Sequence, residues 1–162
     1  AFMLKITLLT VGKIKEKYFT DAIAEYSKRL GRYCKLNIIE VADEKTPDDA
    51  SEAEEELIKK REGERILAKL PDNAYVCVLA INGKNLSSTE LADKISKTSV
   101  SGFDHIVFII GGSLGLSEEV NKKADMLLSF SRMTFPHQLM RVVLLEQIYR
   151  SFRILNNEPY HK

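Results

Sequence analysis

Residues 104–115 read DHIVFIIGGSLG. Five consecutive apolar side chains, Ile106 to Ile110, come directly before a turn that contains three glycines. A strand that is apolar on both faces is typical of a parallel sheet with helices on each side. The stretch therefore predicts a central strand of an α/β fold, with a glycine-rich loop at its carboxyl end.

Short apolar runs and amphipathic segments alternate on both sides of this strand, which predicts parallel βαβ units. The expected strands are 5–11, 35–41, 75–81, 104–110 and 126–130. The expected helices are 15–30, 51–70, a helix from 87 through 95, a short helix from 117 and a long helix from 136. We expect the pair Asn82-Gly83 to close the third strand, and Pro136 to take the first helical position.

Two capping-box patterns support the helix starts. Ser51 is followed three residues later by Glu54, and Ser87 by Glu90. In such a box, each side chain satisfies the other residue's backbone N–H. Ser117, followed by two glutamates, is a third predicted cap.

The length of 162 residues, with 44% apolar and 29% charged residues, predicts one α/β domain covering residues 1–162. Met3 is expected to be the natural start, with Ala1 and Phe2 either an addition or a native extension. The chain holds no apolar run long enough for a membrane span, so we expect a cytoplasmic protein. Its two cysteines, Cys34 and Cys77, predict small core residues rather than a disulfide framework or a zinc site.

Charge is distributed unevenly along the chain, although the net charge is only +1. Residues 1–35 hold eight Lys and Arg against three Asp and Glu, and residues 132–162 hold five against two. Residues 42–65 hold ten acids against five bases. Two interpretations stay open, a polyanion that contacts the basic terminal regions or ordinary solvated helix faces.

The last expected helix is apolar around most of its circumference. Its apolar side chains are Leu139, Met140, Val142, Val143, Leu144, Leu145, Ile148, Tyr149, Phe152, Ile154 and Leu155. A surface helix of a monomer has one apolar face only. This helix is therefore expected either in a homodimer interface or at the centre of a monomer.

Two loops are candidates for a ligand site. The glycines of 111–115 follow a strand's carboxyl end, where open α/β sheets bind ligands, but glycines also serve tight turns without a ligand. Their spacing does not match the dinucleotide or P-loop patterns. Residues 130–138 combine two aromatics, a methionine and hydroxyl groups, as small-molecule pockets do. Within that loop, a structural role at the helix start is favoured for His137 over catalysis.

Several segments together resemble a known family. They are residues 5–13 (KITLLTVGK), 111–115 (GGSLG), 128–138 (LSFSRMTFPHQ), 141–150 (RVVLLEQIYR) and 159–162 (PYHK). They are similar to the SPOUT methyltransferases, in particular to those that modify large-subunit ribosomal RNA. The similarity covers nearly the whole chain after Met3.

This resemblance implies a SPOUT fold with a deep C-terminal trefoil knot, in a homodimer. Connection rules alone favour a plain doubly wound sheet. The implied reaction transfers a methyl group from S-adenosylmethionine to N3 of a pseudouridine in 23S rRNA, within the assembled ribosome and without a metal. The implied cofactor-binding residues are Leu79, Gly111, Phe130, Ser131, Arg132, Met133, Thr134 and Phe135.

Three further residues are expected to act on the RNA. Arg150 would stabilise negative charge on the base, Tyr160 would stack or bond, and His161 would take the proton or hold phosphate. A tail that only packs on the dimer partner is the alternative for Tyr160 and His161. Two other functions compete with an enzyme, namely a non-enzymatic nucleotide- or RNA-binding module of flavodoxin-like form and a purely structural dimer module.

Overall fold

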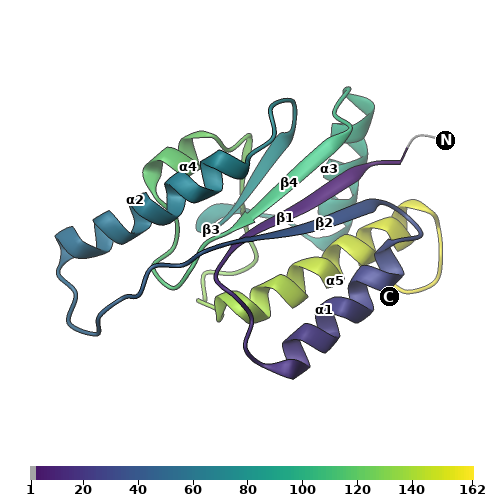
Figure 1. Cartoon of the computed structure of the whole chain (residues 1–162). Coiled ribbons are helices and arrows are strands. Elements are labelled where there is room, and N and C mark those ends of the chain that lie inside the picture. The colour runs from purple at the N-terminus through teal and green to yellow at the C-terminus, as the bar shows by residue number, and fades with distance from the viewer. Residues whose placement is uncertain (1–2) are drawn as a thin grey trace.

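The computed structural model describes residues 3–162, so the expectation about Ala1 and Phe2 lies outside the described residues. Its centre is a sheet of parallel strands in the order β2-β1-β4-β3-β5 (Figure 1). The strands are β1 (Lys5–Val11), β2 (Lys35–Val41), β3 (Tyr75–Asn85), β4 (His105–Ile110) and β5 (Met126–Ser129). The strand of the quoted stretch, β4, is the middle one, as predicted.

Helices cover both faces of the sheet (Figure 1). They are α1 (Lys17–Leu30), α2 (Glu52–Lys69), α3 (Ser88–Val100), α4 (Glu118–Lys122) and α5 (His137–Leu155). One buried cluster joins the sheet to α1, α3 and α5, and a second joins it to α2 and α4. Both faces of β4 are buried because its side chains enter the two clusters alternately.

The predicted helix caps are confirmed. Capping boxes are complete at Ser51 and at Ser87, and the Ser117 side chain accepts a hydrogen bond from the Val120 N–H. These caps satisfy N–H groups that have no partner inside their helices. They fix the starts of α2, α3 and α4 directly after the three serines.

The third strand departs from the prediction. The pair Asn82-Gly83 does not end β3, because the strand continues to Asn85 after its register against β5 shifts between Leu79 and Lys84. A Cβ atom on Gly83 would lie 2.7 Å from the carbonyl carbon of Leu127. The glycine therefore permits a close approach of two backbones within the sheet, which a turn signal alone does not distinguish from a chain reversal.

The start of α5 also differs in detail. Pro136 occupies the N-cap position, with φ −53° and ψ 132°, rather than the first helical position. One turn into the helix, the 1% exposed Arg141 pairs with Glu40 of β2 at 2.6 Å. It also donates hydrogen bonds to the carbonyl oxygens of Val11 and Gly12 at 2.8 and 2.9 Å. Arg141 thus fixes the beginning of α5 to the carboxyl ends of β1 and β2.

Packing within one chain explains much of the apolar character of α5. The helix contacts both α1 and α3 and covers the sheet between them. Within α5, all of which the structure describes, Leu155 is the only large apolar side chain that counts as exposed, at 37%. The interpretation of a central helix therefore accounts for most of the pattern, and a dimer interface on α5 stays a prediction.

Strand order overturns the flavodoxin-like fold of the non-enzymatic alternative but does not test its binding function. A flavodoxin-like sheet has the order 2-1-3-4-5, whereas this sheet exchanges the third and fourth strands. Cys34 and Cys77 are buried core residues, as predicted. Among residues 3–162, no helix combines the length and the apolar character that crossing a membrane requires.

Candidate functional site

A cavity of about 640 Å³ opens at the carboxyl ends of β4 and β5, beside residues 79–81 in the middle of β3. Three segments form most of its wall, namely 79–81 of β3, the glycine loop 110–116, and the loop 130–137 that leads into α5. The parallel strands bring these loops to one edge of the sheet, where α/β folds bind ligands. Both loops that the sequence indicated are therefore parts of a single cavity.

Most of the expected cofactor-binding residues lie in the wall of this cavity. The lining includes Leu79, Gly111, Phe130, Ser131, Met133, Thr134 and Phe135. Arg132 is the exception, because its exposed side chain is not part of the lining. Ile81, Met133 and Phe135 are large apolar side chains that remain 50%, 74% and 39% exposed. An apolar rim of this kind is typical of a surface that a ligand or partner covers.

The glycine loop is held in a tight turn. The Gly115 N–H donates to the Gly112 carbonyl oxygen at 3.1 Å, and Gly115 has a φ of +85° that favours glycine. A Cβ atom on Gly111 would lie 2.9 Å from the Gly115 carbonyl carbon. A side chain at Gly111 would therefore collide with the glycine loop itself.

The part of the cavity wall that residues 3–162 form is electrically neutral. It contains no Asp, Glu, Lys or Arg, and its one titratable side chain is His137. Burial, followed by the charge of Arg141, holds the pKa of His137 below its usual value, so the imidazole is neutral near pH 7. Such a wall can accept a ligand with a positive centre without repelling it.

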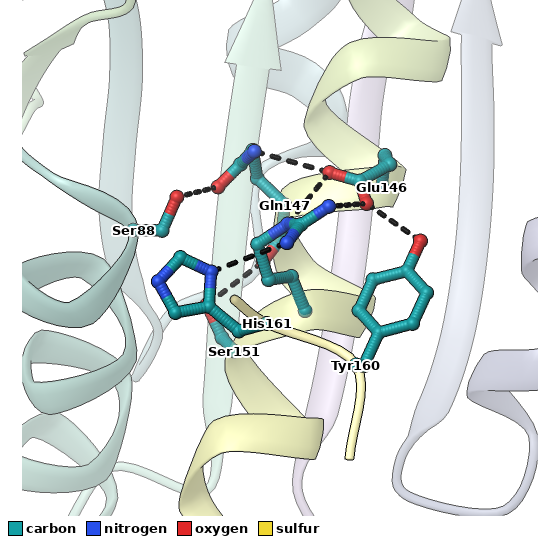
Figure 2. Close-up of polar contacts among 7 residues, drawn as sticks. Ser88, Glu146, Gln147, Ser151, Tyr160 and His161 are labelled. Carbon is teal, nitrogen blue, oxygen red and sulfur yellow. Dashed lines mark hydrogen bonds and ion pairs between the residues drawn. The ribbon is translucent and has the colours of Figure 1, made fainter.

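A second polar cluster, which we call the tail cluster, joins α5 to the C-terminal residues (Figure 2). It consists of Glu146, Arg150, Tyr160 and His161. The Arg150 guanidinium donates to both carboxylate oxygens of Glu146, at 3.3 and 2.9 Å, and the Tyr160 hydroxyl donates to Glu146 at 2.7 Å. Arg150 Nη1 lies 3.2 Å from His161 Nδ1, and its guanidinium lies 4.7 Å from the centre of the Tyr160 ring. The three expected catalytic residues are therefore neighbours.

The tail reaches this position by reversing direction after α5. Asn157 has a φ of 53°, in the left-handed region that asparagine tolerates better than most residues. Arg153 then holds the returning segment, since it pairs with Glu158 at 2.8 Å and donates to the Pro159 carbonyl oxygen at 2.8 Å. These contacts fold the tail onto the helix from which it emerges.

The cluster sets the protonation of two of its members. Burial and the neighbouring Glu146 carboxylate raise the pKa of Tyr160 to about 12, so its hydroxyl acts as a hydrogen-bond donor rather than a base. The hydrogen bond to Glu146 raises the pKa of Arg150, which stays charged. Sequence reasoning missed Glu146, although its i,i+4 spacing from Arg150 was a usable sign.

The tail cluster and the cavity lie apart in one chain. Met140 lines the cavity, and Arg150 follows ten residues later on the same helix. At 1.5 Å per residue, their backbones are about 15 Å apart along α5. None of Arg150, Tyr160 and His161 contributes to the cavity wall.

A methyltransferase family model matches residues 4–161, and its description is "Predicted SPOUT methyltransferase". The chain belongs to the SPOUT methyltransferase family. One relative of this SPOUT chain, from Bifidobacterium adolescentis, is named ribosomal RNA large subunit methyltransferase H. The two are 65% identical over 98% of the chain and 100% of the relative. A Clostridium beijerinckii protein of the same name is 62% identical over the same shares.

Solved structures also share the SPOUT chain's fold. One is a Haemophilus influenzae protein described as a "probable methylase family protein", with a TM-score of 0.52 and 16% identity. It is matched over 98% of the SPOUT chain and 70% of its own length. Within residues 3–162, the SPOUT chain has no group of three or more His, Cys, Asp or Glu side chains placed to hold a metal ion.

Proposed function

We propose that this protein methylates N3 of the pseudouridine at position 1915 of 23S rRNA, on the assembled ribosome in the cytoplasm, with S-adenosylmethionine as methyl donor. The observation that carries the proposal is the uncharged cavity beside β3 and at the carboxyl ends of β4 and β5, in a chain of a methyltransferase family. The names of the full-length relatives support large-subunit ribosomal RNA as the substrate. The proposal also includes the trefoil knot that the family resemblance implies.

The residues of the cavity suit S-adenosylmethionine. Leu79, Phe130 and Phe135 offer apolar walls for an adenine. Its polar edge can bond backbone groups of Gly111, Ser131, Met133 and Thr134. A neutral wall tolerates the positive sulfonium, whereas a lysine or arginine there would repel it. The cofactor, when bound, supplies an electrophilic methyl group.

The tail cluster supplies the groups that the RNA base requires. Methylation of an imide nitrogen needs the removal of its proton and stabilisation of the charge that develops on the ring. In this proposal Arg150, which Glu146 orients, stabilises that charge. The Tyr160 hydroxyl donates to Glu146, which leaves its ring to stack on the base. His161 is then the group that accepts the proton or holds a phosphate.

A homodimer would unite the two parts of the site. Because Arg150 lies about 15 Å along α5 from the cavity, we propose that the tail cluster of one protomer serves the cavity of its partner. The distribution of charge supports RNA binding on the same side. The basic terminal regions form α1 and α5 on one face of the sheet, and the acidic region forms most of α2 on the other.

The proposed function is tested by titration calorimetry with S-adenosylmethionine, followed by methylation of ribosomes from a strain that lacks the modification. We expect binding of the cofactor, transfer of one methyl group to each ribosome, and a modified pseudouridine by mass spectrometry. Cofactor binding without transfer to ribosomes or free 23S rRNA would contradict the proposed reaction. RNA binding without cofactor binding would instead support the non-enzymatic alternative.

The shared site is tested by mixing two inactive chains. Gly111→Val removes the cavity through its collision with Gly115, and Arg150→Ala removes the tail cluster. Mixed dimers should recover about half the activity of the parent dimer, because one of their two sites is free of both changes. Mixed dimers that form, as shown by native mass spectrometry, but stay inactive would exclude a site shared between protomers.

A further inference from the structure

Of the residues from 3 to 162 that line the cavity, His137 is the one with a titratable side chain, and neither the expected cofactor residues nor the tail cluster includes it. It is the first residue of α5, next to Pro136, and it lines the space enclosed by the glycine loop and the loop 130–136. Its backbone position is fixed, because Arg141 anchors the same helical turn to Val11, Gly12 and Glu40.

The two nitrogens of His137 have different surroundings. Nδ1 is fully buried and has no hydrogen-bond partner within residues 3–162. The Nε of Arg141, four residues later, is also buried and without a partner in the same part of the chain. Residues four apart lie on the same side of a helix. The two atoms make no direct hydrogen bond, so a water that donates to an unprotonated Nδ1 and accepts from the Arg141 Nε–H would satisfy both.

This pairing determines the tautomer. If Nδ1 is the acceptor, a neutral imidazole carries its proton on Nε2. Nε2 makes no hydrogen bond to residues 3–162, and unlike Nδ1 it is not among the buried atoms that lack a partner. It is therefore accessible to a ligand in the cavity that His137 lines. Burial, followed by the positive charge of Arg141, lowers the pKa of His137 and so opposes a second proton on the ring, whereas Asp43 acts in the opposite direction.

We propose that His137 is a ligand-binding residue of the cavity, which donates a hydrogen bond from Nε2–H to an acceptor oxygen of the bound ligand. The inference rests on the proposed function for the identity of that ligand. Two ligands offer such an oxygen, namely the carboxylate of S-adenosylmethionine and a carbonyl of the RNA base. Arg141 acts through His137 as a positioning residue, since it fixes the tautomer.

Three replacements of His137 distinguish the contributions of its two ring nitrogens. His137→Gln retains an N–H donor near the position of Nε2, His137→Asn retains a polar atom near Nδ1, and His137→Phe retains neither. Each variant is compared with the parent by thermal melting, so that a loss of folding is recognised. We expect the Gln variant to bind and react nearly as the parent does, and the Asn and Phe variants to lose function alike.

Calorimetry distinguishes the two sources of the oxygen. If the carboxylate is the acceptor, His137→Phe should weaken S-adenosylmethionine binding about tenfold or more. Methylthioadenosine, which lacks the amino-acid part, should then bind the variant and the parent equally. If the RNA base is the acceptor, cofactor affinity stays constant and kcat/KM on ribosomes falls by a similar factor.

Two outcomes would overturn the inference. One is a folded His137→Phe variant with the parent's cofactor affinity and the parent's kcat/KM. The other is recovery by His137→Asn but not by His137→Gln, which would assign the effect to Nδ1 and the packing of Arg141. Failure of the parent chain to bind S-adenosylmethionine would contradict the proposed function instead, and the two failures are therefore distinguishable.

Discussion

Replacing Arg150 by alanine should lower kcat for ribosome methylation about 100-fold or more, the usual cost of losing a donor that stabilises developing charge. Cofactor affinity should not change, because Arg150 does not line the cavity. The replacement also leaves the Glu146 carboxylate without its guanidinium partner. Single-turnover methylation and calorimetry on the same preparation measure both quantities.

Two variants serve as controls for this prediction. Arg61→Ala removes a guanidinium on α2, which pairs with Glu44 on the opposite face of the sheet, and should leave kcat unchanged. Arg150→Lys keeps the charge but loses the two-pronged contact with Glu146, so it should recover only part of the rate. Equal losses of cofactor affinity and kcat in Arg150→Ala would assign the residue to the cavity rather than to the substrate.

Replacing Arg141 by methionine should lower the free energy of unfolding by about 2–4 kcal/mol, as measured by urea titration. The side chain is 1% exposed, and its loss leaves two carbonyl oxygens, of Val11 and Gly12, without their donor. Glu40 is 38% exposed, so water offsets part of the lost ion pair. The estimate is therefore below the cost of breaking a fully buried pair.

The matched control for Arg141 is Arg61→Met. Arg61 is 53% exposed and contacts Glu44 at 3.3 Å, and exposed pairs contribute about 1 kcal/mol or less. If the two methionine variants lose similar stability, the buried contacts of Arg141 do not stabilise the start of α5 as argued. A large loss in the Arg141 variant should also lower cofactor affinity, because α5 begins at the cavity.

Local chemistry explains which parts of the fold could be predicted from the sequence. Capping boxes at Ser51 and Ser87 and the apolar run of β4 act over a few residues, and each appears where expected. The two loops of the cavity follow strand ends, so parallel pairing alone places them together. The SPOUT family was recognised from five short segments and is confirmed.

Long-range contacts explain the rest. In the sequence, Gly83 indicates a turn. Its role in the structure is to let the backbone of Leu127, 44 residues later, approach closely. In the sequence, Arg141 looks like a surface charge on an apolar helix. Its three acceptors come from β2, β1 and Gly12, the residue that follows β1. Glu146 also looks like a surface charge in the sequence, because its partner Tyr160 reaches it only after the tail reverses at Asn157.

The placement of α5 between α1 and α3 also affects how the chain folds during its synthesis. Until residues 137–155 have emerged, the apolar face formed by Leu8, Phe108 and their neighbours lacks its central cover. The pairing of β1 with β4 already joins residues about 100 positions apart, such as Lys5 and His105, and contacts this distant in sequence slow folding. Nascent chains should therefore remain unfolded, and open to chaperones and to aggregation, until translation is nearly complete.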